Sequence, residues 1–421
     1  MAVVYGIFRF VVPPFSHCFC PGISTFTYIL FEGIPLIVIP LKMYSGIDVF
    51  VLLSIPGFIL AGNLMNSCGM TDRIIRFSNN LLGHIRGGLS LANIGASMIF
   101  SGISGTAISD TASIGSVMIP AMKKEGYKAD FSCAVTAASS TIGPIIPPSL
   151  PMIIAGSLTG ISIGKLFLAG AVPGILLAIG LGIVSYSISI RKSHPKQPKA
   201  SWKQRGKGFI DAFWALMMTF LILFGIIGGV FTPTEASVVA VLYALLVGFL
   251  FYRTLSWKSI VSVMTSSAGT TASLMLLVGF ANLFGWILIS EQIPQSLAQW
   301  LLTITQNKFL LLLLINILLI IVGSFMETIA ALLIVYPILL NVAVSVGIDP
   351  IQFSVIAVLN LIIGLNTPPV GVCLFVASGI GKVSMEKVAK AGFPFLLVSL
   401  LILMLVTYIP ALSLFLPGLF E

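Results

Sequence analysis

Charged residues are scarce in this chain. Only 8% of its 421 residues are charged, whereas 57% are hydrophobic. A soluble globular domain carries about 25% charged residues. A chain with so few charges cannot cover a water-facing surface, so this scarcity excludes a soluble globular protein. We expect membrane lipid to surround most of the chain.

Histidine and cysteine are also rare. The three histidines are His17, His84 and His194, and the five cysteines are scattered apart from Cys18 and Cys20. The cysteines have neither the spacing of zinc ligands nor that of a disulfide framework. We therefore expect them to act as small apolar side chains, and we expect no organic cofactor.

The basic surplus has two interpretations. The formal net charge of +9 would suit nucleic-acid binding, but basic residues also accumulate in the cytoplasmic loops of membrane proteins. The apolar composition favours the second interpretation, so we expect no nucleic-acid partner. At about 20 apolar residues per span, the length allows about ten to twelve membrane passes.

An internal repeat relates two parts of the chain. The Pro-Pro pair at 147–148 recurs at 368–369, a shift of 221, and each pair follows a glycine by four positions. The Gly-Phe pair at 57–58 recurs at 279–280, a shift of 222. Several landmarks in the same order with nearly one shift indicate two copies of one unit.

Basic loop residues indicate which way each copy faces. The first copy carries six of them between its helices, whereas the matching stretch of the second, about 293–350, has only Lys308. The second copy carries Lys382, Lys387 and Lys390 where the first has only Lys165. Because basic loops stay cytoplasmic, equivalent loops lie on opposite sides. We predict an inverted repeat, as in many secondary transporters.

The same patterns predict the domain organisation. Residues 1–32 form an atypical N-terminal segment that is neither a clean apolar run nor a signal peptide. The first inverted repeat follows at 33–190 and the second at 253–421. Between them lie a linker at 191–208, whose charged residues are all basic, and two scaffold helices at 209–252. We expect this linker to be cytoplasmic.

Each copy contains one interrupted helix. The stretch 131–158 holds four prolines and a glycine near its middle, and proline removes a hydrogen-bond donor and clashes with the preceding turn. The second copy repeats the interruption at 364–369, inside the stretch 351–378. Paired interruptions in two halves are the best sequence indication of a transporter's binding site.

A second irregular element precedes each broken helix. Small and hydroxyl residues with a carboxylate occupy 100–110, and a similar stretch occupies 322–328. We predict that both are tips of re-entrant hairpins, near 90–122 and 310–341. Each tip would meet its neighbouring helix break near the membrane midplane. The predicted fold is thus an all-α polytopic membrane protein with inverted repeats, two re-entrant hairpins and two broken helices.

Residue types at the tips and breaks suggest ligands. Helix N-termini attract anions, and unwound carbonyls with Ser, Thr and Asn oxygens suit Na⁺. The predicted substrate contacts are Ser104, Thr106, Asp110 and Ser149. The predicted Na⁺ ligands are Ser101, Ser104, Thr141, Gly143, Gly323, Ser324, Asn366 and Thr367. For each residue, helix packing or helix capping is the alternative; Glu327, a second carboxylate at membrane depth, is open in the same way. Ser266 and Ser273 lie outside both tips and are predicted to be neutral.

Two other classes of protein can be weighed. The sequence Gly-Ile-Ser-Gly at 102–105 matches the motif of intramembrane serine proteases. That chemistry requires a histidine to take the serine proton, and no histidine lies within a predicted span, so we expect no enzymatic activity. A passive channel is the other class, but a pore does not require hairpin pairs with matched broken helices.

The motifs at 101–110, 142–149, 231–236 and 364–371 together resemble the large M subunit of tripartite ATP-independent periplasmic (TRAP) transporters. The resemblance covers residues from about 33 to 421. It implies elevator-type transport and scaffold domains, Na⁺ coupling, and the bacterial inner membrane. It also implies two partners, a small Q-type membrane subunit and a periplasmic substrate-binding protein. The substrate implied is an organic acid, namely a C4-dicarboxylate, a sialic acid or another sugar acid. The alternative is a stand-alone Na⁺/anion symporter of related elevator fold.

Overall fold

The structure is a computed structural model that describes residues 19–293, 296, 303, 305 and 307–419, without the side chains of 19–24 and 101–104. Every regular element within these residues is helical. Among them, eight helices are long and apolar enough to cross a membrane. The prediction of an all-α polytopic membrane protein is confirmed.

The helices alternate between long spans and shorter pieces. In chain order they are α2 (Phe19–Phe31), α3 (Val38–Ile47), η2 (Phe50–Leu53), α4 (Ser54–Ser67), α5 (Met70–Leu82), α6 (Gly88–Ser104), α7 (Ala107–Lys124), α8 (Ala129–Ser140), α9 (Leu150–Thr159), α10 (Ile163–Arg191), α11 (Trp202–Ile227), α12 (Pro233–Leu246), η3 (Val247–Phe251), α13 (Trp257–Ser290), α15 (Lys308–Phe325), α16 (Thr328–Ser345), α17 (Pro350–Gly364), α18 (Val372–Gly381), α19 (Met385–Tyr408) and α20 (Ala411–Leu419).

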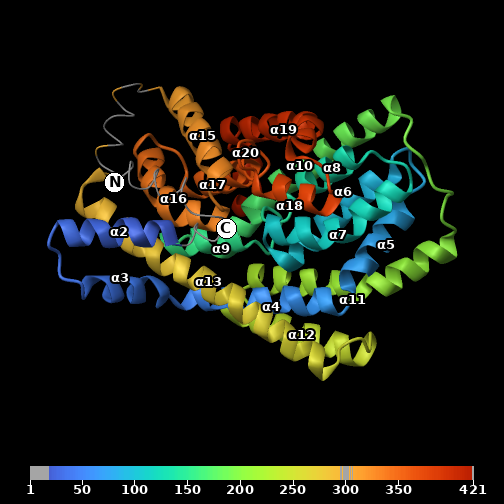
Figure 1. The fold of residues 1–421 in the computed structure, drawn as a ribbon, viewed down its shortest axis with the longest axis horizontal. Coiled ribbons are helices and arrows are strands. Elements are labelled where there is room, and N and C mark those ends of the chain that lie inside the picture. The colour runs from blue at the N-terminus through green and yellow to red at the C-terminus, as the bar shows by residue number, and fades with distance from the viewer. Residues whose placement is uncertain (1–18, 294–295, 297–302, 304, 306, 420–421) are drawn as a thin grey trace.

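The helices form two groups, which lie one above the other in Figure 1. In the lower group, α13 packs against α2, α3 and α4, and α4 packs against α12. In the upper group, α8 packs against α7, α18 and α19, and α17 packs against α15, α16 and α19. Helix α5 contacts both groups, because it packs against α11 on one side and α6 on the other.

The repeat is visible in the helix bounds. Helices α7 and α16 begin and end 221 residues apart, and α8 and α17 begin 221 residues apart. Helices α9 and α18 begin and end 222 residues apart, and so do the starts of α10 and α19. These are the shifts that the Pro-Pro and Gly-Phe pairs gave, so the sequence landmarks lie at equivalent structural positions.

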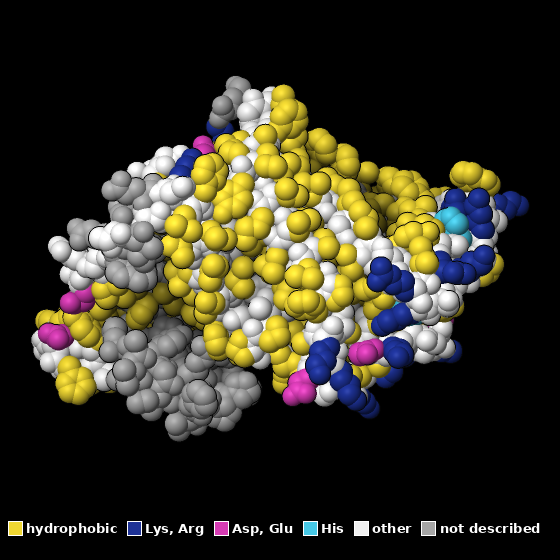
Figure 2. Space-filling view, turned by 90° about the horizontal axis from the view of Figure 1, so that it is seen from above, with side chains coloured by type: hydrophobic (Ala, Val, Ile, Leu, Met, Phe, Trp, Pro, Cys, Tyr) yellow, Lys and Arg dark blue, Asp and Glu magenta, His cyan; other side chains and the backbone are white. Residues whose placement is uncertain are grey.

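The surface separates into an apolar middle and a basic end. Hydrophobic side chains cover the centre of the face in Figure 2, and Lys and Arg gather at one end. That is the end of Figure 1 at which α10 leads into α11. Large apolar side chains such as Phe220 and Phe224 of α11 are more than half exposed. Such a surface suits lipid around the middle and water at the basic end.

Two predicted segments have more regular structure than expected. The predicted linker at 191–208 ends earlier, because α11 begins at Trp202, where Ser201 and Gln204 form a capping box. The atypical segment at 1–32 contains helix α2 from residue 19, which packs against α13. Proline and cysteine near the start of α2 obscured its apolar character in the sequence.

Candidate functional site

The tip of the first hairpin is the turn between α6 and α7. Gly105 adopts φ +64°, a conformation that L side chains rarely adopt. Thr106 is extended and caps α7, because its hydroxyl oxygen accepts a hydrogen bond from the backbone N–H of Ser109 at 3.4 Å. A Cβ added at Gly105 would lie 3.0 Å from Cγ of Leu150, the first residue of α9. The tip therefore lies directly on the second half of the broken helix.

The tip of the second hairpin has the same design with a different cap. Glu327 precedes α16, and its Oε2 accepts hydrogen bonds from the backbone N–H groups of Ile329 at 2.8 Å and Ala330 at 3.3 Å. The shift of 221 relates Glu327 to Thr106, so the repeat places a carboxylate where the first copy has a hydroxyl. Both helix N-termini, which carry a partial positive charge, thus end at the tips.

The first helix break holds a buried carboxylate. Helix α8 ends at Ser140 and α9 begins at Leu150, with turns between them. A Cβ added at Gly143 would lie 2.0 Å from Oδ2 of Asp110, so the Asp110 carboxylate occupies the space that a side chain at 143 would need. Asp110 is fully buried. The hydroxyl of Thr111 donates to Oγ of Ser140 at 2.8 Å, which joins hairpin 1 to the break.

The second helix break joins the two copies. Nδ2 of Asn366 donates to the carbonyl of Ala137 in α8 at 2.8 Å. Oδ1 of Asn366 is buried and has no hydrogen-bond partner among the described residues. A Cβ added at Gly364 would lie 2.4 Å from the carbonyl carbon of Gly323. The backbones of hairpin 2 and the broken helix are therefore in direct contact, which glycine at both positions permits.

A cavity of about 370 Å³ lies where the tips meet the lower group of helices. Hairpin 1 contributes Thr106 and Ser113, and hairpin 2 contributes Glu327. The remaining lining includes polar side chains of α4 and α13, namely Asn63, Asn66, Thr270 and Ser273. Nδ2 of Asn66 donates to Oγ of Ser113 at 3.3 Å, a direct polar contact between the two groups of helices.

The predicted site residues divide into four sets. Thr106 lines the cavity. Thr141 and Asn366 line a separate cavity of about 10 Å³ between the two broken helices. Gly323 and Ser324 lie against Gly364, while the backbone of Gly143 lies against Asp110. The side chains of Ser101 and Ser104 lie outside the described residues.

Two predicted hydroxyls are engaged inside the protein. Ser149 is fully buried and caps α9, accepting from the backbone N–H of Met152 at 3.2 Å and donating to the carbonyl of Pro144. The hydroxyl of Thr367 donates to the carbonyl of Ile363 at 3.0 Å. This geometry favours a capping role for Ser149 over substrate contact, and no measurement yet separates the two.

Sequence reasoning missed the α4 and α13 side of the cavity. Asn63 and Asn66 lie in an apolar span, and such polar residues at membrane depth are functional candidates by default. Nδ2 of Asn63 donates to Oγ of Ser267 on α13 at 2.9 Å. Ser273, which we predicted to be neutral, lines the cavity and is therefore unsuitable as a control. The pairing of α4 with α13 could not be deduced from residue spacing.

Comparison with known proteins gives a family match over nearly the whole chain. Residues 7–412 match the family described as "Tripartite ATP-independent periplasmic transporter, DctM component". The match includes most of residues 1–32, which we described as atypical.

Individual relatives cover most of the chain as well. The sialic acid TRAP transporter large permease protein SiaM of Vibrio cholerae is 45% identical over 379 residues, 90% of this chain and 89% of its own length. The C4-dicarboxylate TRAP transporter large permease protein DctM of Rhodobacter capsulatus is 37% identical and covers 94% of each chain. The isethionate TRAP transporter permease protein DctMQ of Oleidesulfovibrio alaskensis is 39% identical over 99% of this chain and 66% of its own length.

One solved structure shares the fold. The Alcanivorax borkumensis YdaH transporter is similar with a TM-score of 0.60 over 85% of this chain and 83% of that chain, at 16% identity. Identity at this level supports a shared fold and nothing more specific.

Proposed function

The chain belongs to the DctM-component family of tripartite ATP-independent periplasmic transporters, and on this premise we propose that it takes up a small organic acid together with Na⁺ by an elevator movement. Members of this family are membrane transporter permeases, so the predictions of a multi-pass inner-membrane transporter and of no enzymatic activity are confirmed. The substrate, the coupling ion and the movement are proposals, argued below.

The cavity between the hairpin tips and α4 and α13 supports this proposal most directly. Its volume of about 370 Å³ lies in the range of about 300–1,000 Å³ that small-molecule sites occupy. It combines apolar walls with a few convergent polar groups. We place the organic acid here, with Thr106 as a contact from hairpin 1 and Asn63 and Asn66 as contacts from α4.

The charge of the cavity supports coupling to a cation. Its lining includes the carboxylate of Glu327 and neither lysine nor arginine. An organic anion entering beside Glu327 meets only the partial positive charges of the α7 and α16 N-termini. A co-transported Na⁺ would supply the missing positive charge. A coupled cation also explains how uptake is driven without ATP, since charge movement yields about 2.3 kcal/mol per charge per 100 mV.

Oxygen atoms near the helix breaks suit Na⁺. Oδ1 of Asn366 is a buried acceptor without a hydrogen-bond donor among the described residues. Asn366 and Thr141 line a cavity of about 10 Å³, room for about one water-sized sphere. We propose Asn366 and Thr141 as Na⁺ ligands, with backbone carbonyls near Gly143 and Gly323 as further candidates, and Ser101, Ser104, Ser324 and Thr367 as additional ligands. Asp110 is proposed to hold Gly143 in place beside this site.

The two groups of helices suit an elevator movement. The upper group contains both hairpins and both broken helices, whereas α4 and α13 of the lower group form one wall of the cavity. We propose that the upper group carries substrate and ions past the lower group, which acts as the scaffold. Breaking the contact between Asn66 and Ser113 would accompany this movement.

Relatives guide the choice of partners and substrates. The names of three relatives specify sialic acid, C4-dicarboxylates and isethionate, which are all small organic acids. We propose a periplasmic substrate-binding protein and a small Q-type subunit as partners. The additional length of DctMQ, of which this chain matches 66%, supports a second membrane component.

Uptake into proteoliposomes tests the proposal. The chain is reconstituted with its Q-type subunit, and labelled sialic acid, succinate or isethionate is supplied with and without the binding protein. We expect uptake of one acid that requires an inward Na⁺ gradient and the binding protein. Full uptake without the binding protein would favour the stand-alone symporter, and uptake without Na⁺ would refute cation coupling.

A pair of variants locates the ion site. Asn366→Ala removes Oδ1 and should shift half-maximal Na⁺ activation to higher concentration. Ser378→Ala serves as the control, because Ser378 is exposed and its hydroxyl donates only to the carbonyl of Phe375 at 2.7 Å. If both variants keep the Na⁺ dependence of the original protein, Asn366 is a packing residue. Measuring uptake per folded protein separates this result from a loss of stability.

A further inference from the structure

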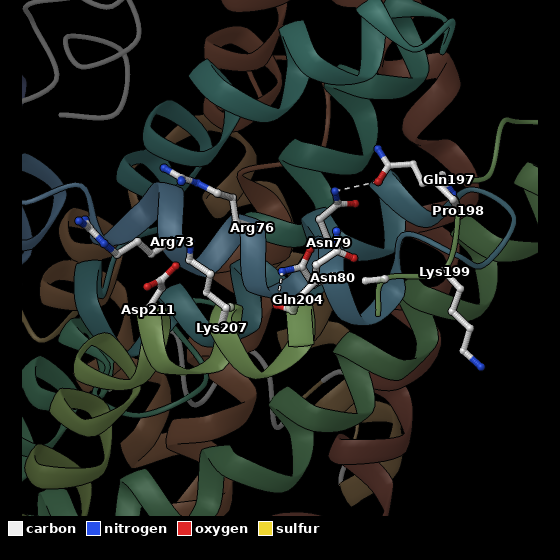
Figure 3. Close-up of a pocket in the computed structure, with 12 residues that line it drawn as sticks. Arg73, Arg76, Asn79, Asn80, Gln197, Pro198, Lys199, Gln204, Lys207 and Asp211 are labelled. Atoms are coloured by element: carbon white, nitrogen blue, oxygen red, sulfur yellow. Dashed lines mark hydrogen bonds between the residues drawn. The ribbon is translucent and has the colours of Figure 1, made fainter. Parts of the chain in front are cut away.

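A second and larger cavity lies far from the substrate site, at the basic end of the molecule. Its volume is about 670 Å³, and it is enclosed by α5, α11 and the linker that precedes α11. Figure 3 shows side chains of α5 on one wall and side chains of α11 on the other. On α11 the lining residues Gln204, Lys207 and Asp211 are three or four positions apart, so they share one helix face.

The charges of this cavity do not balance. Arg73, Arg76, Lys199 and Lys207 line it, whereas Asp211 is the one carboxylate in its lining, which leaves a surplus of three positive charges. Among the described residues, Arg76 and Lys207 have neither a hydrogen-bond acceptor nor an ion-pair partner. An anion entering between these two side chains would gain charge-assisted hydrogen bonds.

The walls of the cavity are fixed rather than collapsible. Nη1 of Arg73 donates to the carbonyls of Cys68 at 3.0 Å and Gly69 at 2.9 Å, and its guanidinium lies 3.7 Å from the ring centroid of Tyr252. Nδ2 of Asn79 donates to Oε1 of Gln197 at 2.9 Å, which fastens the linker to α5. The cavity is therefore a built site with one anchored arginine.

The position of the cavity along α11 indicates its occupant. Trp202 at the start of α11 is 86% exposed, and Ile210, less than one turn after Lys207, is 69% exposed. Tryptophan marks the boundary between membrane and water, and an exposed isoleucine belongs among lipid chains. Lys207 and Arg76 therefore lie at the depth of lipid headgroups, on the side where basic loops gather.

We propose that this cavity binds the phosphate group of an anionic phospholipid from the cytoplasmic leaflet. Basic pockets between membrane helices on this side are known to receive such headgroups. The bound phosphate would bridge Arg76 of α5 and Lys207 of α11. Because α5 also packs against α6 of hairpin 1, the lipid would fasten the connection between the two groups of helices.

Thermal unfolding of the purified full chain in mixed micelles tests this proposal. Phosphatidylglycerol should raise the melting temperature of the original protein more than phosphatidylcholine does. The variant R76Q/K207Q should bind phosphatidylglycerol about thirtyfold more weakly, because each basic residue contributes about 1 kcal/mol to binding an anionic lipid surface and 1.4 kcal/mol is tenfold. The charge-preserving variant R76K/K207R should retain most of the effect.

Matched controls distinguish this site from general attraction. K387Q/K390Q makes the same change of charge at two exposed lysines outside the cavity and should leave the phosphatidylglycerol effect intact. Equal loss in K387Q/K390Q, or unchanged affinity in R76Q/K207Q, would overturn the proposal. Equal stabilisation by millimolar inorganic phosphate would overturn it as well, since the site would then bind a soluble anion. If R76Q/K207Q does not fold, the single variants R76Q and K207Q are measured, each with about fivefold weaker binding expected.

Discussion

Replacing Gly364 by alanine tests the contact between hairpin 2 and the second helix break. The added Cβ would lie 2.4 Å from the carbonyl carbon of Gly323, 2.6 Å from its Cα and 2.8 Å from the backbone nitrogen of Ser324. All three atoms belong to the backbone, so no side chain can rotate away. Ordinary contact begins near 3.4 Å, and the tip must move by about 1 Å.

Both the stability and the transport activity should fall. Overpacking of this kind costs about 1–3 kcal/mol. A displacement of about 1 Å in a positioned site can also reduce a rate by about a hundredfold. We therefore expect uptake per folded protein to fall more than the melting temperature alone would suggest, because the displaced tip carries Glu327 into the cavity.

Gly379→Ala is the matched control. Gly379 lies in α18 of the same repeat, and a Cβ there would meet nothing within 4 Å. Both substitutions remove a helical glycine and gain a similar stabilisation, about 0.5–1 kcal/mol, so the comparison isolates the steric term. The two variants are compared by thermal unfolding in detergent and by uptake into proteoliposomes. If Gly364→Ala unfolds and transports like Gly379→Ala, the tip does not pack on the break as described.

Three further predictions concern separate regions. Thr106→Ala removes the cap of α7 and should cost about 0.5–2 kcal/mol and reduce uptake, whereas Thr106→Ser should retain both; equal loss in the two variants would contradict the capping role. Burial of His194, with Lys192 nearby, lowers the pKa of its imidazole, so stability should be lost as the pH falls below about 6.5, where the unfolded chain binds the proton. His194→Gln should flatten that dependence of the melting temperature, and an unchanged slope would exclude His194 as its source. In a background without native cysteines, a cysteine at position 199 should be protected from an impermeant thiol reagent applied outside, while cysteines at 234 and 345 should react; the reverse pattern would invert the topology.

Much of the fold could be predicted because the membrane restricts backbone geometry. Apolar spans must be helical, and proline interrupts a helix wherever it occurs in the interior. The predicted breaks at 131–158 and 351–378 correspond to α8 with α9 and α17 with α18, and the predicted hairpins correspond to α6 with α7 and α15 with α16. Helix ends were less predictable, since α11 begins inside the predicted linker through a cap at Ser201.

The candidate site could be predicted only in part. Thr106 was identified from the sequence because the repeat and the breaks directed attention to the tips. The roles of neighbouring hydroxyls were not predictable, because Ser149 and Thr106 both follow turns and both cap helices. Only Thr106 lines the cavity, and that depends on which helices pack beside each cap.

The sequence by itself determined the solvent, the helical class and the repeat, because these depend on composition and on periodic landmarks within one chain. The tertiary structure decided which surfaces meet. It placed Asn63 and Asn66 of α4 opposite the hairpin tips, and it brought Arg76 of α5 opposite Lys207 of α11 around a second cavity. Residues more than a hundred positions apart form these sites through helix packing, and packing depends on the shapes of whole helix faces rather than on the spacing of residues along the chain.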